Sequence, residues 1–130
     1  MSKFRCLVMG ASGAVLVLLA AAVLIPAYGD YLGRATLSEV LAELESYRHE
    51  IAEKATNQGT MENAGVGVAI SPEDSLRLGV NYARIFSDGT IVFRHGRYEQ
   101  VIVWEPTMAG GNVTWRCVGG PRKSVPPWCR

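Results

Sequence analysis

Apolar and polar positions divide the chain into an uninterrupted apolar run, an amphipathic stretch and a region of alternating residues. From Leu7 to Ala27 no residue is charged, and most are leucine, valine, alanine, glycine or isoleucine. A helical run of this length measures roughly 30 Å, which is about the thickness of the hydrocarbon core of a bilayer. Lys3 and Arg5 precede it. Because basic flanks stay on the cytoplasmic side, the run predicts a transmembrane helix with a cytoplasmic N-terminus and an exported remainder.

A cleaved signal peptide is the competing interpretation of the same residues. Lys3 and Arg5 would form its basic region, and the three alanines at 20–22 would form a small-residue cleavage site. The apolar run is longer than the usual signal core of about 7–15 residues, and it continues past those alanines to Pro26. Its length favours a retained anchor. Pro26 lacks an amide hydrogen and crowds the carbonyl one turn back, so we expect it to bend the helix rather than end it.

An amphipathic helix is predicted after the proline, from residue 28 to residue 57, continuous with the apolar run. Apolar side chains recur there at three- and four-residue spacing, which places them on one stripe of the helix. The members of this stripe are Leu37, Val40, Leu41, Leu44, Tyr47 and Ile51. Gly59 is available for a left-handed cap at the end. Because a helix with one apolar stripe needs a surface to cover it, we expect a sheet or another helix against this face.

Four β-strands are expected in the second half of the chain. Alternation of apolar and polar residues predicts them at Val80–Phe86, Thr90–His95, Tyr98–Trp104 and Asn112–Cys117. Turn-forming residues separate them at 87–89, 96–97 and 110–111, and Pro106 is expected to end the third strand. Consecutive strands with short turns predict an antiparallel meander, with one face on the helix and the other in water. The predicted fold class is therefore α+β.

Two of the three cysteines lie near the C-terminus. Cys117 and Cys129 enclose a short proline-containing segment, residues 118–128. In an exported domain we expect these two to form a disulfide, and export disfavours the alternative of two free buried thiols. Closing a loop of this size stabilises the fold by about 3 kcal/mol in the chain-entropy model. Cys6 lies at the cytoplasmic edge of the apolar run, where no exported partner is expected.

Basic residues gather toward the C-terminus, although the formal net charge of +1 is uninformative as a total. From residue 116 onward there is no acidic residue, and the basic ones are Arg116, Arg122, Lys123 and Arg130. With Trp115 and Trp128 nearby, they would make a basic aromatic patch for DNA or another anionic ligand. We favour the simpler interpretation that Trp115 belongs to the core, that Trp128 packs on the disulfide loop, and that the charges keep this loop solvated.

Catalytic and metal-binding patterns are missing from the sequence. His49 and His95 have no ligand-like spacing to each other or to a cysteine. There is no G-x-S-x-G elbow, phosphate-binding glycine loop or CxxC pair. The carboxylates are dispersed along a solvated helix, whereas a paired acid and base would need burial to separate their pKa values. The sequence predicts no enzyme activity, no metal, no cofactor and no small-molecule substrate.

Two stretches of this sequence resemble the type IV pilins. The first is Ile-Pro-Ala-Tyr-Gly-Asp-Tyr at 25–31, which resembles the point where the pilin transmembrane helix continues as its amphipathic half. The second is Gly-Asn-Val-Thr-Trp-Arg-Cys at 111–117 with Cys129-Arg130, which resembles the last strand and the C-terminal disulfide loop. Similar strand edges at 88–91 and 105–106 lie between them. The resemblance covers nearly the whole exported region in order.

The resemblance implies a protein whose N-terminal helix packs into the core of a filament while its globular domain lies outside. It would serve adhesion, twitching motility, DNA uptake or secretion. The implied partners are other pilin subunits, the pilus assembly machinery and the bacterial inner membrane, with the C-terminal domain in the periplasm, or on an extracellular pilus once assembled. We accordingly expect an anchor at residues 1–27 and an exported pilin-like domain at residues 28–130.

One departure from the family concerns the N-terminus. The glycine–phenylalanine cleavage pair of the pilins falls on Phe4-Arg5, and the glutamate of their apolar segment falls on Met9. We therefore expect an unprocessed relative that is a subunit of the filament or accessory to it. The alternative is a soluble periplasmic domain, released by signal peptidase, that binds an anionic polymer through its basic C-terminal loop.

Overall fold

The computed structural model describes residues 2–130, with side chains from Ser12 onward. The expectations for Phe4, Arg5, Cys6 and Met9 concern side chains outside this described set. The elements in chain order are α1 (Ser2–Glu43), α2 (Glu45–Gln58), α3 (Pro72–Arg77), β1 (Val80–Ile85), β2 (Ile91–His95), β3 (Val101–Ala109), β4 (Asn112–Gly120) and the 3₁₀ turn η1 (Pro127–Cys129). The chain divides into two compact units, and the boundary between them in the sequence falls between Leu32 and Gly33.

The long helix passes Pro26 without interruption, as expected, and the bend at this proline stays a prediction. The expectation of one continuous helix to residue 57 is wrong at Leu44, which separates α1 from α2. There the Tyr47 amide donates to the Leu44 carbonyl at 3.2 Å, and this i,i+3 bond marks a locally tightened turn. The predicted cap is confirmed, since Gly59 has a φ of 75° and its amide donates to the Ala55 carbonyl.

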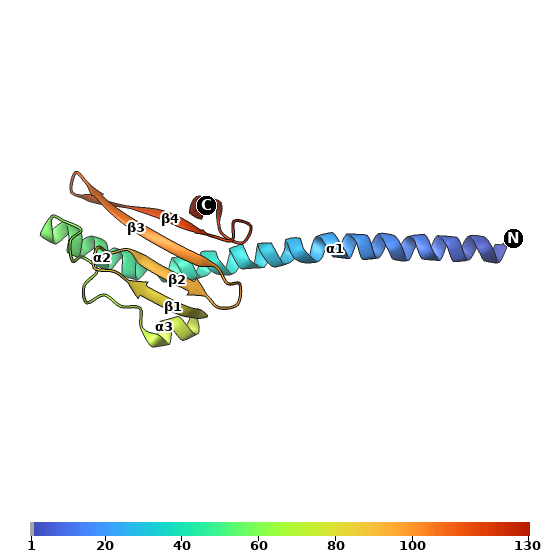
Figure 1. Cartoon of the computed structure of the whole chain (residues 1–130), viewed down its shortest axis with the longest axis horizontal. Coiled ribbons are helices and arrows are strands. Elements are labelled where there is room, and N and C mark those ends of the chain that lie inside the picture. Colours follow the sequence, from blue (N-terminus) through green and yellow to red (C-terminus); the bar gives the residue numbers. More distant parts are fainter. Residues whose placement is uncertain (1) are drawn as a thin grey trace. The chain divides into compact units, whose positions relative to one another are not determined.

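The four strands form one antiparallel sheet in the order β1-β2-β3-β4, which confirms the predicted meander (Figure 1). The prediction that Pro106 ends the third strand is wrong, because β3 begins at Val101 and continues to Ala109. Strand β2 pairs with β3 only as far as Trp104, so at Pro106 only β4 lies beside β3. A proline without an amide hydrogen is tolerated where a strand has such a free side. The fourth strand likewise extends past Cys117 to Gly120.

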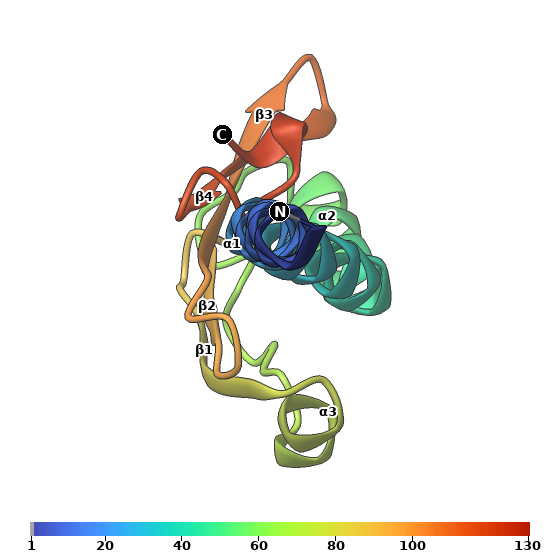
Figure 2. The same cartoon turned by 90° about the vertical axis from the view of Figure 1, so that its right-hand side faces the viewer.

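The hydrophobic core lies between the helices and one face of the sheet (Figure 2). The predicted stripe is confirmed: Tyr47 packs at its edge and the rest is buried. On the sheet side, Phe93 and Trp104 meet edge to face with their ring centroids 6.0 Å apart. The short helix α3 lies beyond the core, next to β1 (Figure 2).

The turn between β1 and β2 has the predicted chemistry. Gly89 adopts a φ of 86°, and the Thr90 amide donates to Asp88 Oδ1 at 2.9 Å. A Cβ on Gly89 would lie 2.7 Å from Ile51 Cγ2. Glycine is therefore required here both for its backbone conformation and for the close approach of α2.

Candidate assembly helix and disulfide loop

The N-terminal unit presents its apolar side chains on the outside of a single helix. Leu16, Leu18 and Ile25 are 67%, 69% and 70% exposed. By length and composition, α1 is the one helix of the described chain that qualifies as a membrane span. Fully covering a leucine, valine or isoleucine side chain stabilises by about 1.5–3 kcal/mol, so this segment requires either lipid or other apolar helices around it.

A pair of tyrosines marks the end of the apolar segment. Tyr28 and Tyr31 are both exposed, and their rings stack with centroids 6.5 Å apart. Asp30, between them, is the first charged residue after Arg5. Tyrosine is enriched where a membrane meets water, because its ring is apolar and its hydroxyl is polar. The side-chain chemistry of α1 therefore changes from lipid-compatible to water-compatible around residues 28–31.

The C-terminal loop is closed by the predicted disulfide between Cys117 on β4 and Cys129 in η1. Cys129 is fully buried, and its amide donates to the Pro126 carbonyl at 3.0 Å. Val125, within the loop, is also fully buried and belongs to the core. The loop is thus part of the folded unit rather than an appendage to it.

A buried glutamine fastens this loop to α1, and sequence reasoning did not identify it. Gln100 is fully buried, and its Nε2 donates to the Gly33 carbonyl at 2.9 Å and to the Ser124 carbonyl. A Cβ on Gly33 would lie 3.3 Å from both Gln100 Nε2 and Ser124 Cβ, so glycine permits this close approach. Arg34 adds a second link by donating to the Lys123 carbonyl at 2.6 Å. A lone glutamine after a turn carries no periodic pattern that marks it as buried.

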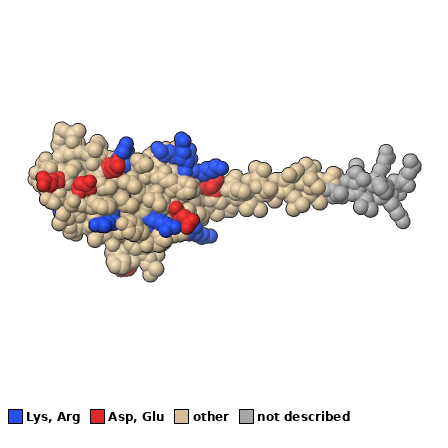
Figure 3. All heavy atoms as spheres, viewed as in Figure 1, with Lys and Arg blue, Asp and Glu red and all other residues tan. Residues whose placement is uncertain are grey.

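The four C-terminal basic residues do not gather with Trp115. Arg116 is on the solvent face of the sheet, where its Nε donates to Glu105 Oε2 at 2.9 Å, while Trp115 packs against the core on the other face, as expected. The remaining three basic residues, Arg122, Lys123 and Arg130, are exposed, and none forms an ion pair with another described side chain. On the face drawn in Figure 3, basic and acidic side chains are interspersed over the folded unit. The anionic-ligand patch stays a prediction.

Hydrogen bonds to the Asp74 carboxylate join α3 to α2 and shift the pKa of Asp74. The Tyr47 hydroxyl donates to Asp74 Oδ2 at 2.5 Å, and Arg77 Nη2 donates to Asp74 Oδ1 at 2.9 Å. These hydrogen bonds, chiefly the one from Tyr47, lower the pKa of Asp74 from 3.8 to about 2. On β2, burial and then the nearby Arg97 lower the pKa of His95. The described residues contain no cluster of three or more His, Cys, Asp or Glu able to hold a metal.

Comparison with known protein families identifies a match for most of this chain. A family model for pilin, the subunit of a bacterial filament, matches residues 33–130. The match spans the whole of the compact unit from Gly33 to Arg130 and well over half of the chain. The helix half that packs on the sheet, the four strands and the disulfide loop therefore all fall within it.

Proposed function

This chain belongs to the pilin family of bacterial filament proteins, and we propose that its apolar helix first anchors it in the inner membrane. The same helix then packs against neighbouring subunits when the chain enters a filament. Membership of this family supports the role of a pilus subunit. The observation that carries the rest is the exposure of the apolar segment, whose large side chains are more than half exposed along residues 15–25. Lipid before assembly, and the helices of neighbouring subunits after it, are the two environments that would cover these side chains.

The proposed topology rests on charge and on the disulfide. Lys3 and Arg5 favour a cytoplasmic N-terminus. The disulfide between Cys117 and Cys129 is the kind of bond that persists in the periplasm and is rare in the cytosol. Both arguments support a folded unit outside the cytoplasm, first in the periplasm and then on the filament.

The apolar run also suggests which kind of subunit this is. Residues 7–27 contain no carboxylate, so in lipid the helix carries no buried charge that requires a partner on another subunit. Its contacts would depend on apolar packing, aided by small residues such as Gly13 and the alanines at 20–22, which let helix backbones approach closely. We therefore propose an accessory subunit rather than the bulk component of the filament.

Fractionation with intact-mass measurement tests the proposal. We expect the native protein at full-length mass in the membrane fraction, with a minor portion in sheared filaments. Leu18→Arg should lower both portions, because a charge at the centre of a span costs about 2.5–3.5 kcal/mol. Leu76→Arg is the matched control, since Leu76 is 85% exposed on α3 and its replacement should change neither. A soluble product that lacks residues 1–22 would contradict the proposal and support the released periplasmic domain instead.

A further inference from the structure

The folded unit begins at Gly33, only two residues after Tyr31. At 1.5 Å per residue of helix, these two residues lie about 3 Å apart along α1. Tyr28 and Tyr31 are the side chains around which α1 changes from lipid-compatible to water-compatible chemistry. With α1 anchored in a bilayer, the surface of the folded unit around Gly33 would therefore lie next to the lipid headgroups.

A turn and a loop of the folded unit close around Gly33. They lie at the same end of the sheet, since Val101 at the start of β3 pairs with Gly120 at the end of β4. Gln100, which follows the turn between β2 and β3, donates through Nε2 to the Gly33 carbonyl at 2.9 Å. The same nitrogen donates to the Ser124 carbonyl in the loop after β4. Residues of this turn and this loop therefore lie near the point where the chain enters the folded unit.

Four basic side chains lie at this end, and we call them the basic rim: Arg34, Arg97, Arg122 and Lys123. Arg97 is exposed in the turn, and Arg122 and Lys123 are exposed in the loop. Arg34 Nη1 donates to the Lys123 carbonyl at 2.6 Å, which brings its guanidinium to the loop. None of the four forms an ion pair with another described side chain.

Acidic side chains close to the basic rim offset little of its charge. Glu99, in the same turn as Arg97, is already paired with Arg94, whose Nη2 lies 2.8 Å from Glu99 Oε1. Asp30, one helical turn before Arg34 on α1, can offset a single positive charge. The basic rim therefore keeps a net positive charge that is available to an anionic partner.

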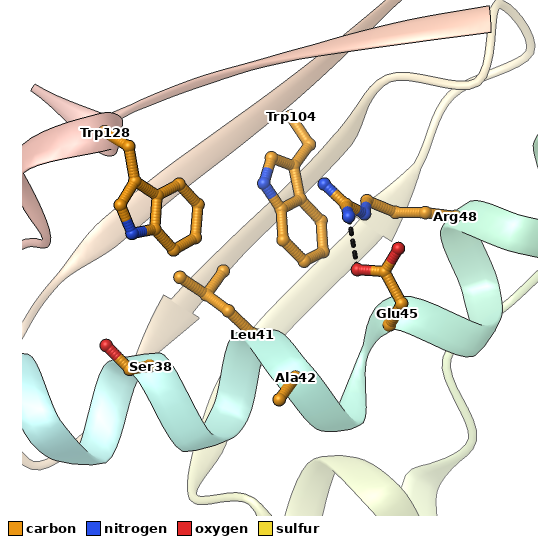
Figure 4. Close-up of a pocket in the computed structure, with 7 residues that line it drawn as sticks. All are labelled: Ser38, Leu41, Ala42, Glu45, Arg48, Trp104 and Trp128. Atoms are coloured by element: carbon orange, nitrogen blue, oxygen red, sulfur yellow. Dashed lines mark hydrogen bonds and ion pairs between the residues drawn. The ribbon is translucent and has the colours of Figure 1, made fainter.

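Aromatic side chains near the basic rim are not arranged for stacking on nucleic-acid bases, which requires accessible rings. Tyr98, in the turn, is half-buried and stacks on His95 with ring centroids 5.6 Å apart. We expected Trp128 to pack on the disulfide loop, but it is 57% exposed and lines a shallow pocket with Leu41 (Figure 4). Leu41 follows Arg34 by seven residues, which is roughly 10 Å along the helix. The basic rim thus fits an anionic surface better than it fits single-stranded nucleic acid.

We propose that the basic rim binds the headgroups of anionic phospholipids while α1 anchors the chain. Its guanidinium and ammonium groups would donate charge-assisted hydrogen bonds to phosphate oxygens. Basic residues next to a membrane span are attracted to anionic lipids, and this attraction falls off within a Debye length. The contact would hold the folded unit against the bilayer until the chain enters a filament. This inference rests on the anchoring role in the proposed function and adds the class of lipid that the anchored chain prefers.

Amine acetylation of the full chain in lipid nanodiscs tests the contact. The chain carries its own reporter and control, because its lysines are Lys3, Lys54 and Lys123. Lys54 is 21 residues beyond Gly33, roughly 30 Å of helix, which is several Debye lengths at about 0.15 M salt. Nanodiscs of phosphatidylcholine alone are compared with nanodiscs that also contain phosphatidylglycerol. After treatment with N-acetoxysuccinimide, peptide mass spectrometry gives the acetylation rate of each lysine.

The expected result is protection of Lys123 that depends on lipid charge. At about 0.15 M salt, Lys123 should be acetylated about fivefold more slowly in the anionic nanodiscs than in the neutral ones. At about 1 M salt, where screening is nearly complete, it should react at the same rate in both. Lys54 should react at one rate in both kinds of nanodisc at each salt concentration.

Two charge reversals form a matched pair of variants. Arg97→Glu reverses one charge of the basic rim at a position distant in sequence from Lys123, and it should remove most of the protection. Arg84→Glu is the control, because Arg84 is also exposed but lies on β1, outside the basic rim. Each arginine lies over an aromatic ring, Arg97 at 5.5 Å from the Tyr98 centroid and Arg84 at 4.8 Å from that of Phe86. Arg84→Glu should retain the protection of Lys123.

The outcomes separate this inference from the proposed function. Loss of the unmodified chain from both kinds of nanodisc would contradict the anchor, and the inference with it. A retained chain whose Lys123 reacts equally in both would overturn the inference and leave the anchor intact. Protection that extends to Lys54, or that Arg97→Glu leaves unchanged, would also overturn it. Protection by single-stranded DNA in neutral nanodiscs, without protection by phosphatidylglycerol, would overturn it and assign the basic rim to nucleic acid.

Discussion

Replacing Gln100 by glutamate would change a buried donor into an acceptor while keeping the shape of the side chain. Gln100 Nε2 donates to the carbonyls of Gly33 and Ser124, and the side chain is fully buried. In Gln100→Glu, an ionised carboxylate oxygen would face those two carbonyl oxygens. Gln100 Oε1 already lacks a partner among the described residues, so the new residue gains no compensating donor. The substitution therefore tests the clamp between α1 and the disulfide loop.

The size of the effect follows from the pKa that this site would impose on the new carboxyl group. Full burial raises the pKa of a glutamate by up to about 3–5 units above its ordinary value of about 4.3. A folded-state pKa above the unfolded one means that the folded protein binds more protons, so its stability falls as pH rises above about 4.3. Each pH unit in that window costs about 1.4 kcal/mol. The stability that the variant loses relative to the unmodified chain is therefore expected to be about 3–4 kcal/mol larger at pH 7 than at pH 4.

Unfolding of the full chain in lipid nanodiscs at pH 4 and pH 7, followed by near-ultraviolet circular dichroism, measures this difference. Gln58→Glu is a matched control, because Gln58 Nε2 also donates to two backbone carbonyls but is exposed at the end of α2. Water solvates the new carboxylate there, so we expect a change within about 0.5 kcal/mol at both pH values. If Gln100→Glu were as stable as the unmodified chain at pH 7, the clamp would contribute little to the fold. Equal destabilisation at both pH values would instead contradict the raised pKa of the new carboxyl group.

Three further predictions concern the folded unit. Asp74→Asn should lower its stability at pH 7; because the pKa of Asp74 is lowered to about 2, this stability is present above pH 3.8 and lost as pH falls toward 2. Thermal unfolding across pH 2–5 checks that the difference from the unmodified chain shrinks in that window. Joint replacement of Cys117 and Cys129 by serine should cost about 3 kcal/mol in guanidinium unfolding by the chain-entropy model. The full chain should cause no salt-sensitive mobility shift of single-stranded DNA. A shift that disappears when Arg122 and Lys123 are both replaced by alanine would contradict this and support the basic patch.

Much of the fold could be predicted because helices and strands that pack on a core require apolar residues at regular spacings in the sequence. The helix stripe is visible because 3.6 residues make one turn, and the strands are visible because their side chains alternate between two faces. Asp88 and Gly89 mark a hairpin because only certain residues tolerate its backbone angles. The pairing of Cys117 with Cys129 followed from export, which itself followed from the apolar run.

The remaining features depend on tertiary contacts, which produce no regular spacing of residue types in the sequence. The helix break at Leu44 could not be predicted, because no proline or glycine lies near it in the sequence. The passage of β3 through Pro106 depends on where β2 stops pairing, which is a property of the assembled sheet. The clamp of Gln100 joins residues separated by 67 and 24 positions in the chain. The shallow pocket that Trp104 and Trp128 both line was likewise invisible, because the two side chains are brought together only when the disulfide loop folds back toward the helix.

The clamp and Trp128 are connected through this loop, and the connection bears on where the Trp128 side chain lies. Trp128 is mostly exposed, so burial of its own ring does little to fix its position. Its neighbour Cys129 is joined to β4, and the preceding part of the loop is fastened at Ser124 by Gln100. A side chain held by its backbone on both sides has fewer conformations open to it than one on a free loop. The buried glutamine and the disulfide would thus keep Trp128 near Trp104, where both side chains line one shallow pocket.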